Sequence, residues 1–502
     1  MTAPGERVRY GNLRDPRRPG VAGLGLAATA MAGVAAVAIV LSMMVLGLVA
    51  AGVLLVVVAV VMAPMVLKDR DGRTRYQRFA ARVRHNRAAK RGHTVYVAGP
   101  ASHGTPDGRT RLPGLAAATE LLEAHDVYGA PFAVLHTTAT DHYSIVFQGE
   151  AAGDDLVDQD VTDTQVAHWG GWLSRLGQEP DIAAAAVIVE TAPDPGTRLT
   201  RMIRGHQQPG APEFSNETLE EIVHGYPSAS SIITTRVSMT FTGRARPDED
   251  KRTPDQMLDY LARVVPGFRQ HLTVTGAGTS VRMMSAADLT DAIRVAYDPS
   301  VSQLVDEQRA ENEGGTGLTW SEAGPAFAQE FPDRYAHDGA FSMVWQMRQP
   351  PTGVFTDSVL KALLSPHPDI ARKRVTIIYR PESAEGAARI VERDVRDANT
   401  IMTGKARAQH RDSAALRAAN KAAAEESEGA GLVRFGMIVT ATVTSEAGLP
   451  RAASTINQLS APVKLRLRLA RHNQAAAFAA GLPLGLVLPE HLLLPDMLRD
   501  AL

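Results

Sequence analysis

The chain has no cysteine and few aromatic residues, and each shortage excludes a class of function. Without cysteine it can form no disulfide, thiolate zinc site, iron–sulfur cluster or cysteine nucleophile. Aromatic residues make up 5% of the 502 positions, a small share for a surface that stacks single-stranded bases. Apolar residues make up 45%, so the chain has ample material for buried cores.

The motifs of common enzymes are missing as well. The Gly404-Lys405 pair is followed by Ala406, where a phosphate-binding loop needs serine or threonine. The glycines of Thr275–Gly278 have no third glycine at Val281, which a dinucleotide fingerprint requires. Neither an HExxH helix nor a Gly-x-Ser-x-Gly elbow occurs. We therefore predict a non-enzymatic protein with no catalytic residue, no cofactor and no metal site.

Charge is absent from a long stretch near the N-terminus. Residues 19–67 carry no charged side chain. As one helix they would extend about 73 Å, more than twice a hydrocarbon core of ~30 Å. Lipid offers backbone groups no hydrogen-bond partner, so the stretch predicts two transmembrane helices packed as a hairpin. The expected spans are Val21–Leu41 and Leu46–Leu67, and the turn between them is expected at Ser42–Val45.

Basic residues flank the hairpin on both sides. Residues 1–91 contain 15 Lys and Arg against 4 Asp and Glu, whereas the remainder contains 38 against 50. The tail 1–18 precedes the hairpin and the segment 68–91 follows it. The positive-inside rule then predicts a multi-pass plasma-membrane protein with both termini in the cytoplasm. A cleaved signal peptide is the alternative, but its apolar region is normally about 7–15 residues.

The segment 68–91 has the composition of a basic juxtamembrane helix. A helix of this kind is expected to lie along anionic headgroups. A DNA-binding arm is the alternative, and we expect no sequence-specific contact with nucleic acid. The side chains expected to face lipid are Arg73, Arg75, Arg78, Arg82, Arg84 and Arg87.

Beyond residue 91, strand-like and helix-like segments alternate. A strand–helix–strand–helix–strand–helix order occurs twice, at an offset of about 190–200 residues. This repetition predicts an α+β fold with tandem ferredoxin-like cytosolic domains at 92–330 and 331–502. The second domain would carry a long helical insertion, 383–428, broken near Gly404. Within the first domain, Leu115–His125 has the composition of a helix.

A basic strip stands near the C-terminus. Lys464, Arg466 and Arg468 alternate with leucines, so as a strand they share one face. This face could meet an acidic partner or a nucleic-acid backbone, and we predict it as a partner interface. A solvated edge strand protected by cations is the simpler alternative.

Seven short runs along the chain are distinctive. They are Ala63–Arg70, Leu112–Leu115, Val189–Leu199, Ala296–Pro299, Pro366–Pro381, Gly431–Phe435 and Leu482–Leu486. Together they resemble a family of uncharacterised integral membrane proteins from actinobacterial conjugative and integrative elements, which occur beside type IV secretion components. The likeness extends over nearly the whole chain.

A second resemblance suggests a role. The hairpin is similar to the small membrane subunit that anchors the conjugative ATPase. The soluble part resembles the N-terminal domain of that ATPase without its motor, notably at Gln474, Phe478 and Leu482-Pro483. The resemblance implies an inner-membrane scaffold of a conjugative, type IV secretion-like apparatus. Its implied partners are the lipid bilayer, a separate ATPase and channel subunits, and a homo-oligomer is compatible with this role.

Two other functions stay open. One is a membrane component of a type VII secretion system, which also combines two N-terminal spans with a cytosolic domain. The other is an enzyme with an unrecognised site. Neighbouring genes for a conjugative ATPase and a relaxase would favour the first assignment over the type VII system.

Overall fold

The computed structural model describes most of the chain. The described residues are 8, 10–11, 13, 26–67, 69, 72–100, 102, 107–150, 157–194, 197–208, 210–225, 231–244, 250–277, 280–312, 314–351, 355–404 and 410–492. The predicted tail 1–18 and the break after Gly404 therefore lie largely outside them.

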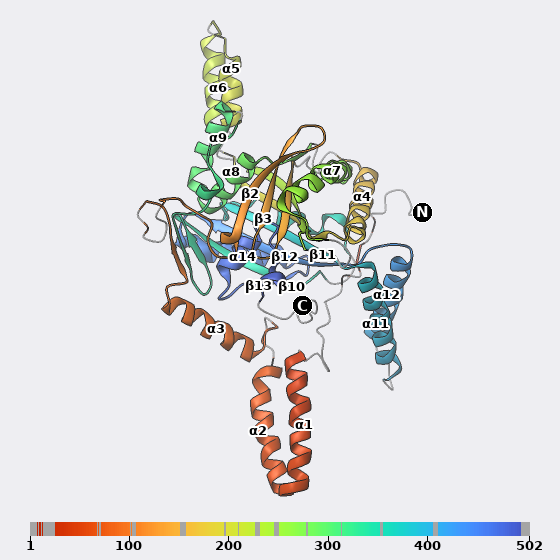
Figure 1. Cartoon of the computed structure of the whole chain (residues 1–502). Coiled ribbons are helices and arrows are strands. Elements are labelled where there is room, and N and C mark those ends of the chain that lie inside the picture. The colour runs from red at the N-terminus through yellow and green to blue at the C-terminus, as the bar shows by residue number, and fades with distance from the viewer. Residues whose placement is uncertain are drawn as a thin grey trace.

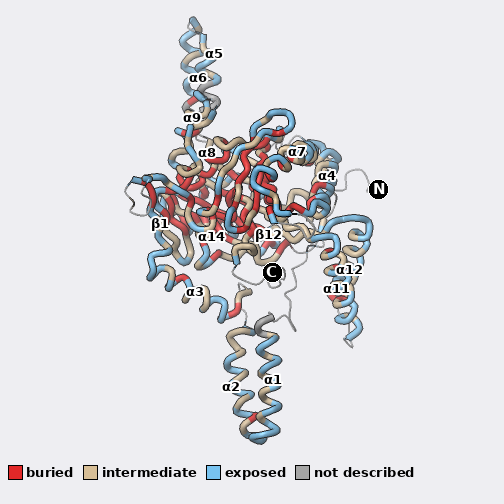
Figure 2. Tube along the Cα trace, in the orientation of Figure 1, coloured by how far each residue is buried: buried red, intermediate tan, exposed pale blue. Residues whose placement is uncertain are grey.

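Two helices near the N-terminus form a hairpin that stands apart from the rest of the molecule (Figure 1). They are α1 (Leu26–Leu46) and α2 (Leu48–Val66). Each is long and apolar enough to cross a membrane, by length and composition. Their apolar spans are 0% and 6% buried within the protein, and Figure 2 shows both helices largely exposed. Exposed apolar surface of this extent marks a contact with lipid or with a partner.

The turn of the hairpin lies at Gly47, a few residues later than the predicted turn at Ser42–Val45. Gly47 adopts φ +89°, in the left-handed region that glycine enters without a steric penalty. The helix continues through Ser42 because a single serine does not end an apolar helix. The two apolar helices are therefore Leu26–Leu46 and Leu48–Val66 within the described residues.

The body of the protein is built on one large antiparallel sheet. Its order is β1-β8-β9-β10-β12-β11-β5-β6-β4-β3-β2, with β13 paired to β10 and β7 paired to β4. The strands are β1 (Val95–Val97), β2 (Thr119–His125), β3 (Pro131–Thr137), β4 (His142–Glu150), β5 (Ile182–Pro193), β6 (Ser231–Thr242), β7 (Val281–Met283), β8 (Phe327–Glu330), β9 (Tyr335–His337), β10 (Ala340–Gln349), β11 (Arg372–Pro381), β12 (Val433–Val443) and β13 (Arg466–Leu469).

The same pairing order occurs twice in this sheet. In the first half it is β7-β4-β6-β5, and in the second half it is β13-β10-β12-β11. The halves meet where β5 pairs with β11, for example at Val189 and Val375. The two predicted domains therefore share one continuous sheet. In addition, β1 and β8, which both fall within the predicted bounds 92–330, pair with each other. They extend the sheet on the side of the second half, because β8 pairs with β9 and β9 pairs with β10.

Helices cover both faces of the sheet. Alternate residues of β3 and β4 point to opposite faces, so Val134 packs with α4 and α7 while Leu135 packs with α8 and α14. On the first face, α10 and α13 cover the second half of the sheet. The core on the α8 and α14 side draws residues from both halves. These helices are α4 (Gln159–Gln178), α7 (Pro254–Thr273), α8 (Ala286–Tyr297), α10 (Lys361–Leu364), α13 (Leu449–Ser460) and α14 (Gln474–Ala480).

Two helical arms project from equivalent positions in the two halves. The first, α5 (Thr197–His206) with α6 (Glu213–Gly225), joins β5 to β6, and its base lies beside α9 (Ser302–Glu311). The second, α11 (Ala384–Thr403) with α12 (His410–Ser427), joins β11 to β12 and agrees with the predicted insertion 383–428. In Figure 1 the first arm points away from the α1–α2 hairpin, and the second extends on the hairpin's side.

One predicted helix is a strand. Leu115–His125 has helix-forming residues, but only the short 3-10 turn Gly114–Ala118 is helical. Thr119–His125 instead forms β2 and pairs with β3 residue by residue, from Thr119 opposite Thr137 to His125 opposite Pro131. The edge pairing and the packing of Leu121 and Leu122 outweigh the local preference for helix.

Candidate functional site

The basic helix α3 (Arg75–Lys90) begins directly at the end of the hairpin. Thr74 and Gln77 form a capping box, with each side chain bonded to the other's backbone amide at 3.2 Å. The Arg75 amide donates to the Leu67 carbonyl at 3.3 Å, which closes the connection into a compact loop. Figure 1 shows α3 running sideways from this point, away from the line of the hairpin.

The outer surface of α3 combines cations with aromatic rings. Tyr76 and Phe79 are 54% and 66% exposed. On the inner side His85 is buried, with its ring 5.1 Å from that of His472. Exposed aromatic and basic side chains on one helix are typical of helices that lie in a membrane interface.

The predicted lipid-facing arginines are found on this helix. Arg75, Arg78, Arg82, Arg84 and Arg87 are exposed on α3, and Arg73 is half-buried just before it. Arg78 forms an ion pair with Asp69 in the connecting loop. Among the described residues, the other four arginines of α3 have no acidic partner. Their charges are therefore available to an anionic surface.

The predicted basic strip lies at the turn into β13 and along that strand. Lys464 and Arg466 are exposed, whereas Arg468 is half-buried and has an interaction of its own. Leu467 and Leu469 point the other way, into the core beneath α13. Beside the strip is a hollow of about 490 Å³, lined by Gln349, Ala461, Lys464, Leu465 and Arg466. The sequence indicated the strip but not the hollow.

The structure brings the strip and the α3 region together. Arg348, at the end of β10, lies against Gly72 in the α2–α3 loop, where an added Cβ would stand 2.7 Å from its Nε. His472, just after β13, lies near the cations of α3. Burial lowers the pKa of His472, and the charges of His85, Arg82, Arg471 and Arg73 lower it further. We call this cationic region the basal surface; it comprises Arg73, Arg82, Arg348, Lys464, Arg466 and Arg471.

Sequence reasoning missed two members of the basal surface, Arg348 and Arg471. Arg348 stands singly among uncharged neighbours, and Arg471 follows the basic strip but breaks its alternation with leucines. Their place emerges only because β10 and β13 pair, from Trp345 opposite Leu469 to Gln349 opposite Arg466. This pairing places Arg348, near the end of β10, and Arg471, just after β13, on the side of the body where the α2–α3 loop lies.

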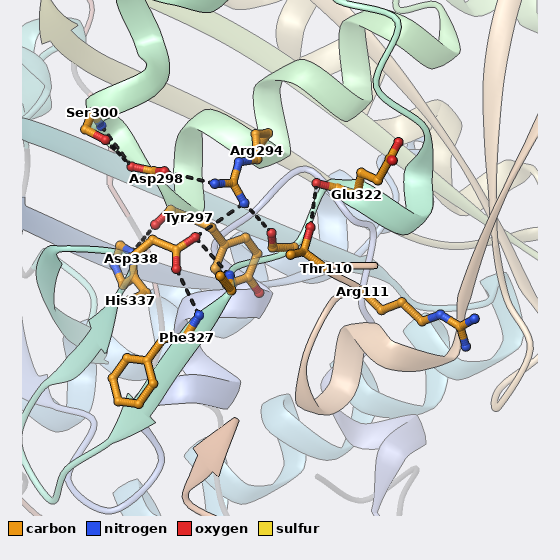
Figure 3. A network of polar contacts seen from close by, with 12 residues as sticks. Thr110, Arg111, Arg294, Tyr297, Asp298, Ser300, Glu322, Phe327, His337 and Asp338 are labelled. Carbon is orange, nitrogen blue, oxygen red and sulfur yellow. Dashed lines mark hydrogen bonds and ion pairs between the residues drawn. The ribbon is translucent and has the colours of Figure 1, made fainter. Parts of the chain in front are cut away.

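A polar network lies elsewhere in the body, between α8 and the β8–β9 edge (Figure 3). Arg294 contacts Asp298 at 2.9 Å and Asp338 at 3.3 Å. Asp338 in turn accepts backbone amides of Ala326 and Phe327, at 3.0 and 2.9 Å. These contacts fasten the helix to the sheet edge.

His337 lies at the end of the same network and resembles part of a catalytic pair. Its Nε2 is 2.8 Å from Ser342 Oγ. However, His337 is 1% exposed and Ser342 is 0% exposed, and Ser342 also contacts Thr442 at 2.8 Å. Burial lowers the pKa of His337 to about 4. This arrangement holds three strands together in the interior, with no opening to solvent at either side chain.

The described residues contain no group of three His, Asp or Glu side chains placed to hold a metal ion. A family model described as a domain of unknown function (DUF8461) matches residues 17–77. This match covers both hairpin helices and ends inside the first turn of α3. No curated protein matches the chain.

Proposed function

We propose that the protein is a non-enzymatic, multi-pass plasma-membrane scaffold of a conjugative, type IV secretion-like apparatus. The anchoring rests on the hairpin, and the assignment to conjugation rests on the family resemblance of the sequence. In this role the α1–α2 hairpin crosses the bilayer twice. The body then docks a separate ATPase or channel subunit in the cytoplasm.

One backbone contact supports the topology with two membrane crossings. Tyr10 precedes the hairpin and Phe355 belongs to the body, yet their backbones pair through two hydrogen bonds of 2.8 and 2.9 Å. Both residues must therefore lie on the same side of any membrane that the hairpin crosses. Two spans satisfy this requirement and one span does not. The basic flanks favour the cytoplasmic side for both.

The body is proposed to consist of two fused ferredoxin-like units. Each half has four antiparallel strands whose spatial order, numbered along the half, is 4-1-3-2. A helix follows the first strand and another follows the third in each half. This connectivity supports the proposal, with α5–α6 and α11–α12 as insertions at the same point of the two units.

The α5–α6 arm is the best-placed contact for a cytosolic subunit. It projects on the side opposite the hairpin (Figure 1). It also exposes large apolar side chains, with Met202 56% and Phe214 78% accessible. Aromatic residues and methionine are enriched at protein interfaces. The arm therefore offers an anchor that a membrane-bound scaffold can extend into the cytoplasm.

Thiol labelling tests the topology, because the natural chain has no cysteine. Leu48→Cys places a thiol at the tip of the hairpin, and Phe214→Cys places one on the α5–α6 arm. On intact cells, a membrane-impermeant maleimide is expected to label the first variant and not the second. After lysis it should label both. Labelling of Phe214→Cys on intact cells would overturn the proposed orientation.

Crosslinking tests the scaffold role. In membranes that contain the conjugative ATPase, the wild-type chain is expected to crosslink to it. Phe214→Asp places a carboxylate on the apolar arm and should abolish the crosslink. Ile401→Asp makes the same change at a 42%-exposed position of the second arm and should retain it. If the wild type crosslinks to no secretion or conjugation subunit, the scaffold assignment is wrong.

A further inference from the structure

The hollow beside β13 has the chemistry of an anion site. Of its five lining residues, two carry positive charge, one is an amide and none is acidic. Among the described residues, neither Lys464 nor Arg466 has an ion-pair partner, and both are exposed. Gln349 adds an amide group that can donate hydrogen bonds. The buried Leu465 contributes an apolar wall.

The position of the hollow links it to the hairpin. Gln349 follows Arg348, which lies against Gly72 of the α2–α3 loop. That loop is short and closed, because the Arg75 amide bonds to the Leu67 carbonyl and the Gly72 amide donates to the Asp69 carbonyl. In Figure 1, β10 and β13 lie on the side of the body nearer the hairpin. The hollow is on the same side, because its lining residues Gln349 and Arg466 belong to these strands.

We propose that this hollow binds the phosphate headgroup of an anionic phospholipid in the leaflet that the hairpin enters. Lys464 and Arg466 pair with the phosphate, and Gln349 bonds to the polar part of the headgroup. The remaining cations of the basal surface attract the same leaflet over a wider area. The proposal rests on the membrane anchoring proposed above, and it adds a specific lipid-binding site to that function.

A lipid is favoured over a protein or nucleic acid by place and by charge. The surface of an anionic leaflet attracts basic residues within about 10 Å, and the body is tied to the bilayer through a closed loop. The α3 helix, with Tyr76 and Phe79 exposed among arginines, continues the same lipid-directed surface. An incoming nucleic acid or protein would have to enter between the body and the membrane.

Native mass spectrometry of the full-length protein in mild detergent tests this site. The protein is given equal amounts of phosphatidylglycerol and phosphatidylcholine, and the bound lipids are counted. We expect the wild type to retain phosphatidylglycerol selectively. Each basic residue contributes about 1 kcal/mol near a membrane surface, so Lys464→Gln with Arg466→Gln should weaken this selectivity roughly twenty- to thirtyfold.

A matched control removes two charges elsewhere. Arg204→Gln with Arg263→Gln makes the same change on α5 and α7, which lie away from the hairpin in Figure 1, and should leave the selectivity unchanged. Lys464→Gln alone should weaken it about fivefold, which provides a milder variant if the double one unfolds. Equal losses in the double variant and the control would overturn the proposal.

Four other results would also overturn it, and one of them overturns the anchoring as well. If the wild type binds inorganic phosphate through Lys464 and Arg466 but shows no lipid selectivity, the site takes a free anion and not a headgroup. If an oligonucleotide binds through Lys464 and Arg466 with no lipid selectivity, the partner is nucleic acid. If the wild type stays dissolved without detergent, the anchoring itself is wrong; detergent dependence without lipid selectivity removes only the headgroup site.

Discussion

Glu190 is a single buried carboxylate at the seam between the two halves of the sheet. Its oxygens lie 3.0 Å from Arg236, 2.9 Å from Arg372 and 3.2 Å from Arg374. Burial by itself raises the pKa of Glu190, but the three guanidinium groups outweigh it and hold the pKa well below its usual value. The carboxylate therefore stays charged at every pH at which the protein would normally be handled.

Glu190→Gln is expected to destabilise the body strongly. It leaves three arginines, each at most 13% exposed, without their anion, and breaking a buried ion pair in this way costs about 3–5 kcal/mol. Glu425→Gln removes an exposed carboxylate paired to Lys421 and should change the free energy of unfolding by under about 1 kcal/mol. Urea titrations of the full-length protein in detergent, followed by tryptophan fluorescence, would measure both. Equal effects would contradict this account of the seam.

Because His337 is buried, we expect the protein to lose stability in mild acid. Burial lowers its pKa from 6.5 to about 4, so below pH 6.5 the unfolded chain takes up a proton that the folded chain does not. The free energy of unfolding should therefore fall as the pH drops from 6.5 towards 4, by roughly 2 kcal/mol at pH 5 for this residue.

A comparison of variants isolates the contribution of His337. His337→Asn should show a smaller difference between its unfolding midpoints at pH 7 and pH 5 than the wild type. His93→Asn changes an exposed histidine and should keep the full difference. An unchanged pH dependence in His337→Asn would show that other groups cause it.

At the scale of a single element, α3 is expected to insert its exposed aromatic side chains, Tyr76 and Phe79, into the lipid interface. Phe79→Cys provides one thiol on the exposed face of α3, and an attached environment-sensitive fluorophore should shift to the blue in vesicles that contain phosphatidylglycerol. Phe214→Cys places the same probe at another exposed aromatic position, far from the hairpin, and should keep the emission of an aqueous site. The same aqueous emission at position 79 would remove α3 from the interface.

At the scale of the whole molecule, the continuous sheet predicts cooperative unfolding. The core on the α8 and α14 side contains Val146 from the first half and Val344 and Ile438 from the second, and β5 pairs with β11 across the seam. Separating the halves would expose this core and leave a long unpaired strand edge. We expect the body to unfold in a single transition in urea, and the fragment 331–502 to aggregate when expressed alone. Two transitions, or a soluble monomeric fragment, would show that the halves are independent domains.

Much of the organisation could be predicted from local pattern. The uncharged stretch 19–67 indicates two apolar helices. Thr74, just before α3, and Gln77, in its first turn, form the capping box of a helix with the expected composition. The insertion 383–428 folds as two helices that end and begin on either side of the predicted break. In each case the preference comes from neighbours in the sequence, and no distant partner opposes it.

Other features depend on partners far apart in the chain. Thr119–His125 becomes a strand because β3 lies beside it, against the preference of its own residues. The basal surface forms because the β10–β13 pairing and the α2–α3 loop bring Arg348 and Gly72 together across more than two hundred residues. A periodic pattern records which face of an element is apolar but not which element will cover it.

The sequence alone thus determined the hairpin, the charge on its flanks and the repeated order of strands and helices, because each follows from residues within one or two turns or strands. The tertiary structure decided that both halves share one sheet, that Glu190 and three arginines meet at its seam, and that the β13 strip faces the hairpin. These outcomes depend on strand pairings between segments up to about two hundred residues apart. Such pairings are chosen by the packing and hydrogen bonding of the whole fold, which no local stretch of the chain encodes.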